Sequence, residues 1–137
     1  MSAVVADLVT ATLANAGISR VFCVPGAHID ELCRSVSSRS DMELVVCRTE
    51  QGSGMMAIAH GRVTGQVACC LTIPGPGLLN LVTALATATA ASVPFLCLAG
   101  GLAAAWNGAS AARRATWTGA APNARLPGNG PASLRGC

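Results

Sequence analysis

Glu50 is the side chain in this 137-residue sequence whose type and position are best suited to chemistry. It follows an apolar run that is typical of a strand, and it falls in the first turn of the helix expected next. A carboxylate there can exchange a proton with a ligand or accept a hydrogen bond from one. It can also do no more than stabilise the helix by facing the positive end of the helix dipole. The residues of this segment leave both interpretations open.

Two glycine-containing turns could bring backbone close to a ligand. Pro25-Gly26 follows the first expected strand, and Gly75-Pro76-Gly77 follows the third. Glycine allows close approach of the backbone, and the helix expected after each turn presents N–H groups at its start. Neither turn has the spacing of a phosphate loop or a dinucleotide-binding loop, and the chain contains no lysine. Nucleotide binding of these two kinds is therefore disfavoured.

Patterns typical of helices and of strands alternate along the chain, and they predict that these residues lie at one edge of a parallel sheet. The expected helices are residues 3–16, 27–37, 50–64 and 78–86, and the expected strands are residues 20–24, 43–47, 67–71 and 94–99. This alternation predicts an α/β fold, an open, doubly wound parallel sheet that is incomplete, with about four βα units. Ligands bind such sheets at the carboxyl ends of the strands, where Glu50 and both turns fall.

Composition excludes several classes of function. Aromatic residues make up 3% of the chain and tyrosine is absent, which argues against a stacking surface for nucleic acid. Residues 63–112 carry no charge, but prolines and glycines cut them into pieces too short to cross a membrane. The sequence has no G-x-S-x-G motif, which disfavours a serine nucleophile. We therefore expect neither a nucleic-acid partner nor a membrane.

The seven cysteines predict no metal site. Their spacing is uneven, with no C-x-x-C and no paired Cys/His pattern. Most have apolar neighbours, among which cysteine acts as a small buried hydrophobe. The first residues lack the pattern of a secretory leader, so we expect a cytoplasmic location, where thiols stay reduced.

The character of the sequence changes after Gly100. Residues 101–137 contain eleven alanines, six glycines and three prolines, and their four arginines have no acidic partner. We therefore divide the chain into a partial domain at residues 1–100 and a low-complexity, disordered tail at residues 101–137, in which residues 103–115 favour a short helix. A sheet that stops at its fourth strand would leave an exposed edge. A GC-rich gene read out of frame yields this composition, so a frameshift is one hypothesis for the tail.

Four blocks of residues, taken in order, resemble one protein family. They are residues 17–26, residues 46–57 around Glu50, Thr72 with the Gly-Pro-Gly-Leu-Leu-Asn of residues 75–80, and residues 92–94 before a strand that ends at Gly100. Together, residues 8–100 resemble the N-terminal, pyrimidine-binding domain of thiamine diphosphate-dependent enzymes, the acetolactate synthase and 2-oxo acid decarboxylase superfamily. Thr49 departs from the family, which often has histidine there.

The resemblance implies a cofactor and its binding residues. In that family the glutamate matching Glu50 is catalytic: it hydrogen-bonds a ring nitrogen of the cofactor's aminopyrimidine and favours the tautomer that removes the thiazolium proton. Asn80 is expected to cap or brace the helix that follows the third strand. The pyrimidine end of thiamine diphosphate would be bound by Pro25, Gly26, Glu50, Gly75, Pro76 and Gly77.

The family's second domain has no match in this sequence. That domain carries a Gly-Asp-Gly…Asn signature, which binds Mg²⁺ and the diphosphate. We therefore expect a fragment that is inactive alone, binds the cofactor weakly or not at all, and associates with another copy or with a chain carrying the diphosphate-binding domain. Two alternatives stay open: the small subunit of a split enzyme, and a non-catalytic interaction protein that uses the apolar residues 84–106. The sequence does not identify the 2-oxo acid.

Overall fold

The sheet of this protein has five strands in the order β2-β1-β3-β4-β5. The computed structural model describes residues 3–101 and 116–118. The first four strands pair in parallel and β5 pairs antiparallel to β4. In chain order the elements are α1 (Ala3–Asn15), β1 (Arg20–Cys23), α2 (Asp30–Ser37), β2 (Glu43–Val46), α3 (Glu50–Thr64), β3 (Ala68–Thr72), α4 (Pro76–Ala90), β4 (Phe95–Ala99) and β5 (Thr116–Thr118).

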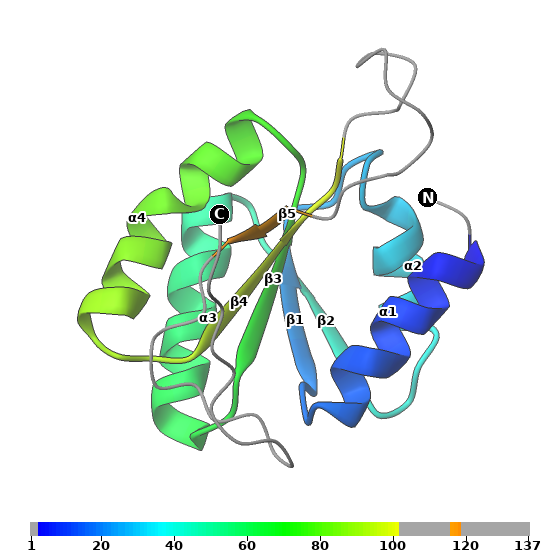
Figure 1. Ribbon diagram of the computed structural model, residues 1–137, viewed down its shortest axis with the longest axis horizontal. Helices are drawn as coiled ribbons and strands as arrows, with labels where there is room; N and C mark the ends of the chain where they lie inside the picture. The colour runs from blue at the N-terminus through cyan, green and yellow to red at the C-terminus, as the bar shows by residue number, and fades with distance from the viewer. Residues whose placement is uncertain (1–2, 102–115, 119–137) are drawn as a thin grey trace.

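Helices cover both faces of the sheet, which confirms the predicted doubly wound α/β fold. Figure 1 shows α1 and α2 on one face and α3 and α4 on the other. In β1, Val21 and Cys23 enter the core under α1 and α2, whereas Phe22 enters the core under α3 and α4. Alternate residues of a strand point to opposite faces, so a strand buried on both faces is apolar throughout. Within the described ranges, no helix is long and apolar enough to cross a membrane.

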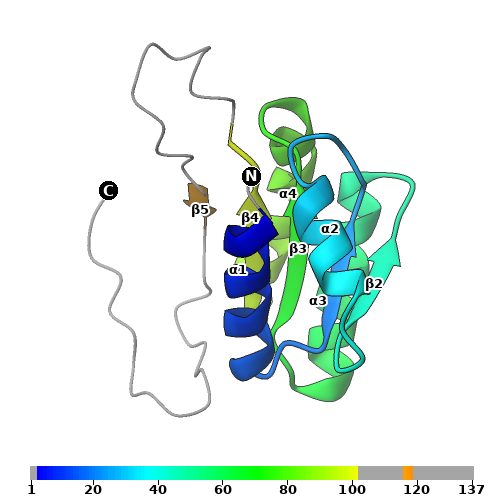
Figure 2. The ribbon, with the colours of Figure 1, turned by 90° about the vertical axis from the view of Figure 1, so that its right-hand side faces the viewer.

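The chain reverses its direction across the sheet at the carboxyl ends of β1 and β3. From β1 it passes through α2 to β2 at one edge, then returns through α3 to β3 on the other side of β1. Figure 2 shows β2 and β5 at opposite edges of the sheet. Ligands of open α/β sheets bind at such a reversal. The segments that contain Pro25-Gly26 and Gly75-Pro76-Gly77 begin there.

Two helices begin at residues other than those predicted. α2 begins at Asp30 rather than at residue 27, because the Ile29 N–H donates a hydrogen bond to the Gly26 carbonyl at 2.8 Å and closes a turn before the helix. α4 extends beyond the apolar stripe of residues 78–86 at both ends and begins at Pro76. Proline suits the first helical turn, where its missing N–H would have no partner within the helix. The first four strands and the other two helices agree with the prediction to within one residue at each end.

β5 is a strand that the sequence did not predict. It lies inside the segment predicted to be a disordered tail, and it pairs with Cys97, Leu98 and Ala99 of β4. The expectation that β4 forms an exposed edge was therefore wrong. Three residues are too few to show an alternating pattern. The rest of the predicted tail, residues 102–115 and 119–137, lies outside the described residues, and so does the helix expected at 103–115.

Candidate functional site

Thr49 and Glu50 open helix α3 directly after β2. Thr49 has an extended backbone, and its hydroxyl accepts a hydrogen bond from the Gly52 N–H at 3.1 Å. A side-chain cap of this kind satisfies an N–H that has no acceptor within the helix. The cap sets the start of the helix, so Glu50 becomes its first residue at the carboxyl end of the sheet.

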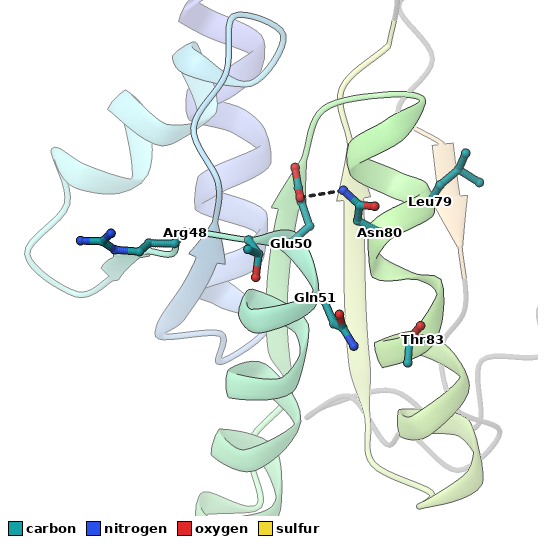
Figure 3. Close-up of a pocket in the computed structure, with 7 residues that line it drawn as sticks. Arg48, Glu50, Gln51, Leu79, Asn80 and Thr83 are labelled. Carbon is teal, nitrogen blue, oxygen red and sulfur yellow. Dashed lines mark hydrogen bonds between the residues drawn. The ribbon is translucent and has the colours of Figure 1, made fainter.

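The two oxygens of the half-buried Glu50 carboxylate have different surroundings. Oε2 accepts a hydrogen bond from Nδ2 of Asn80 in α4 at 3.1 Å, drawn as a dashed line in Figure 3. Oε1 lies 3.2 Å from the point that a Cβ on Gly77 would occupy. Figure 3 also shows that Arg48 extends away from the carboxylate. One oxygen is thus held by the protein, and the other faces glycine backbone.

A residue larger than glycine would not fit at the position of Gly77, because three groups lie close to its Cα. A Cβ there would lie 2.6 Å from Thr72 Oγ1, 2.7 Å from Ile73 Cγ1 and 3.2 Å from Glu50 Oε1. Gly77 is buried in the first turn of α4. The absence of a side chain lets α4 start this close to both the end of β3 and the carboxylate.

Gly26 joins the loop after β1 to the same group of residues. A Cβ on Gly26 would lie 2.6 Å from Ile73 Cγ2, while Cγ1 of the same isoleucine faces Gly77. The structure therefore brings three predicted site residues together from three separate segments: Ile73 packs against Gly26 and Gly77, and Gly77 lies beside Glu50. Loops distant in the sequence meet here because β1, β2 and β3 are neighbours in the sheet.

Pro25, Gly75 and Pro76 were also predicted to bind the cofactor, and they lie at exposed positions near this group. Gly75 has a φ of +71°, a left-handed conformation that glycine adopts without strain, and it directly precedes α4. Pro76 is the first residue of that helix. The assignment of cofactor-binding roles to these residues, and to Gly26, Gly77 and Glu50, remains a prediction.

A pocket of about 400 Å³ opens beside Glu50, between the start of α3 and the start of α4. Its walls offer hydrogen-bond donors and acceptors around one carboxylate, together with one apolar side chain. Of the predicted site residues, Glu50 alone lines it. The lining residues are Arg48, Thr49, Glu50, Gln51, Leu79, Asn80 and Thr83.

Asn80 is the site residue that sequence reasoning missed. It was expected to cap or brace its own helix, but the residue at the cap position of α4 is Gly75, and the Asn80 amide donates to Glu50 instead. A contact between two helices leaves no local sequence pattern. One sequence pattern could have predicted that the lining residues of α4 lie together. It is the spacing of Leu79, Asn80 and Thr83, which places them on one side of a helix.

Comparison with known sequences identifies the class to which this fold and site belong. Residues 3–121 match the family described as "Thiamine pyrophosphate enzyme, N-terminal TPP binding domain". Since the match covers most of the chain, the chain belongs to this family, and the predicted resemblance is confirmed. Thiamine diphosphate is the cofactor of the family. The match extends beyond residue 100, where we had placed the domain boundary.

Particular relatives include synthases and a decarboxylase. The acetolactate synthase of Bacillus subtilis is 40% identical over 95 residues, 69% of this chain and 16% of that protein. The probable 2-ketoarginine decarboxylase AruI of Pseudomonas aeruginosa is 44% identical over 86 residues, 63% of this chain and 15% of that protein. The acetolactate synthase isozyme 1 large subunit of Escherichia coli is 34% identical over 106 residues, 77% of this chain and 19% of that protein. The chain thus spans less than a fifth of the length of these relatives.

Proposed function

We propose that this chain binds the pyrimidine end of thiamine diphosphate through Glu50, as part of an enzyme that decarboxylates or carboligates 2-oxo acids. The observation that carries the proposal is the difference between the surroundings of the two Glu50 carboxylate oxygens. One oxygen is held by Asn80, and the other lies beside Gly77 at the carboxyl end of the sheet. A carboxylate oxygen that Asn80 does not hold suits an aminopyrimidine, whose nitrogen atoms donate and accept hydrogen bonds.

Glycine backbone lies close to the carboxylate. Neither Gly26 nor Gly77 carries a Cβ, and this lets both glycines pack directly against Ile73. Bound thiamine diphosphate supplies the carbanion-stabilising chemistry by which 2-oxo acids lose carbon dioxide or form new carbon–carbon bonds. The part of this chain is to orient the ring and to hold a proton between Glu50 Oε1 and a ring nitrogen.

We further propose that the chain is inactive alone and associates with another copy of itself or with a chain that carries the diphosphate-binding domain. The sequence has no acidic residue after Glu50, and among the described residues no group of three His, Cys, Asp or Glu side chains could hold a metal ion. Mg²⁺ and the diphosphate would be held by that other domain. Exposed apolar side chains near the pocket support such a contact, since Leu79 is 70% exposed and Val82 is 51% exposed.

The same proposal includes a cytoplasmic location. Among the cysteines that the structure describes, Cys23, Cys33, Cys47, Cys69 and Cys70 are free thiols. Reduced thiols suit a compartment in which glutathione and thioredoxin keep cysteines from pairing. Fractionation of cells that express the tagged chain tests this part.

Titration with two forms of the cofactor tests the binding proposal. The ¹⁵N-labelled chain would be titrated with thiamine and with thiamine diphosphate, each with and without Mg²⁺, while NMR records changes in the backbone amide signals. If the chain recognises the pyrimidine end, both ligands bind with similar affinity, weaker than micromolar, and Mg²⁺ changes neither. Tight, Mg²⁺-dependent binding of the diphosphate form would contradict the proposal that this chain binds only the pyrimidine end and that another domain binds the diphosphate. No signal change at millimolar ligand would contradict the site itself.

A further inference from the structure

The amide of Asn80 is directed at the Glu50 carboxylate rather than at its own helix. The residue lies beyond the cap position of α4, and its exposed side chain lines the pocket. The orientation of the amide is defined, because a carboxylate only accepts and Nδ2 is the atom of the amide group that can donate. Asn80 therefore directs a donor to Oε2 at 3.1 Å.

We propose that Asn80 is a positioning residue for Glu50, an inference that rests on the proposed cofactor site. The terminal torsion of a glutamate is broad and roughly two-fold when nothing restrains it. A hydrogen bond to Oε2 restrains that torsion and keeps Oε1 beside Gly77, where the ligand is expected. Hydrogen bonds to ionised groups are the strong ones, so one donor is enough for this purpose.

Three other polar side chains that line the pocket, Arg48, Thr49 and Gln51, do not point at the Glu50 carboxylate. Figure 3 shows both Arg48 and Gln51 extending away from the Glu50 carboxylate. The hydroxyl of Thr49 accepts the Gly52 N–H as the helix cap. Among these lining side chains, Asn80 is thus the one positioned to orient Glu50.

Two substitutions of Asn80 separate the effect of its hydrogen-bond donor from the effect of the shape of its side chain. Asn80→Asp keeps the size but places an acceptor opposite Glu50 at neutral pH. As the pH is lowered, two facing carboxyl groups come to share one proton, and a hydrogen bond between them is restored. Asn80→Ala removes the donor at every pH. Asn15→Asp is the matched control, because it makes the same change at the end of α1, outside the pocket.

The experiment follows thiamine diphosphate binding to the labelled wild type and to the three variants by NMR, at neutral and at mildly acid pH, with thermal melts to verify folding. At neutral pH, Asn80→Ala is expected to bind about tenfold more weakly than wild type, and Asn80→Asp at least as weakly. At acid pH, Asn80→Asp should recover relative to wild type at the same pH, while Asn80→Ala should not. Asn15→Asp should match wild type throughout.

The outcomes distinguish the inference from the proposal on which it rests. A purely structural role would weaken both variants without recovery at acid pH. Wild-type affinity in Asn80→Asp at neutral pH, or a loss that acid does not reverse, would overturn the positioning role and leave the cofactor site standing. If the wild type itself gives no binding, the proposed function fails, and the role of Asn80 fails with it.

Discussion

Substituting Gly77 by alanine is expected to lower the free energy of unfolding and to weaken cofactor binding at the same time. The new Cβ would lie 2.6 Å from Thr72 Oγ1 and 2.7 Å from Ile73 Cγ1, and each atom would have to move by about 1 Å to reach an ordinary contact distance. Thr72 is fully buried at the end of β3, and overpacking of this kind costs about 1–3 kcal/mol. The better helix propensity of alanine offsets at most about 1 kcal/mol. We expect a net loss of about 1–2 kcal/mol.

The effect of this substitution on binding follows from the third contact. The Cβ would lie 3.2 Å from Glu50 Oε1, so the carboxylate must shift by a few tenths of an ångström. Because a hydrogen bond to an ionised group depends on its geometry, we expect affinity for thiamine diphosphate to fall by about tenfold. Gly65→Ala is the matched control. Gly65 ends α3 at the far end from Glu50 with a φ of +72°, and its new Cβ would meet nothing within 4 Å.

Urea denaturation measures the stability of these proteins, and NMR titration measures their affinity. Gly65→Ala is expected to lose about 1 kcal/mol to backbone strain and to keep wild-type affinity. Wild-type affinity in Gly77→Ala would refute the contact between Gly77 and the ligand-binding oxygen. Equal weakening of binding by both variants would also refute it, because affinity would then follow stability alone.

Three further predictions concern the elements that hold the site. Thr49→Ala removes the cap of α3 and should cost about 1 kcal/mol in urea denaturation, while Thr49→Ser keeps it; equal stability of the two would contradict the cap. Leu81→Ala empties a fully buried position and should cost about 2–5 kcal/mol, whereas Leu79→Ala, at a position 70% exposed, should change stability by less than about 0.5 kcal/mol. Burial raises the pKa of the Cys70 thiol to about 12 from its ordinary value of 9.0, so the unfolded chain loses this proton first and stability should fall as pH rises from about 9 toward 12. Urea denaturation over that pH range should show that the stability of Cys70→Ala falls less with pH than that of the wild type. The same fall in both proteins would contradict the assignment of this effect to the Cys70 thiol.

The sheet was predictable because each strand and helix carries its own local signal. The all-apolar run at residues 67–71 predicted a strand buried on both faces, and β3 places Cys69 and Leu71 in one core and Cys70 in the other. Gly65 marked the end of α3, where it adopts the left-handed cap conformation. The carboxyl ends of parallel strands meet at one edge, so the convergence of Glu50 with the glycine turns also followed from the order of elements.

The bond between Asn80 and Glu50 was not predictable, because it depends on how closely two helices pack. α3 and α4 come together at Gly54, where a Cβ would collide with Ala84 and lie 2.8 Å from Leu81 Cδ2. That approach brings an amide and a carboxylate 30 residues apart in sequence into contact. The start of α2 was missed for a similar reason, since the turn at Gly26 is closed by backbone groups that carry no side-chain signal.

The most direct test of the central claim replaces the carboxylate of Glu50 with an amide of the same shape. Glu50→Gln would be compared with wild type and with Glu43→Gln, which changes an exposed glutamate paired with Arg20 at 2.7 Å and lies outside the pocket. On titration with thiamine diphosphate, we predict that the amide signals of Gly26 and Gly77 shift in wild type and in Glu43→Gln, and that Glu50→Gln binds at least about tenfold more weakly. Wild-type affinity in Glu50→Gln, or signal changes that map away from these glycines, would contradict Glu50 as the cofactor-binding carboxylate.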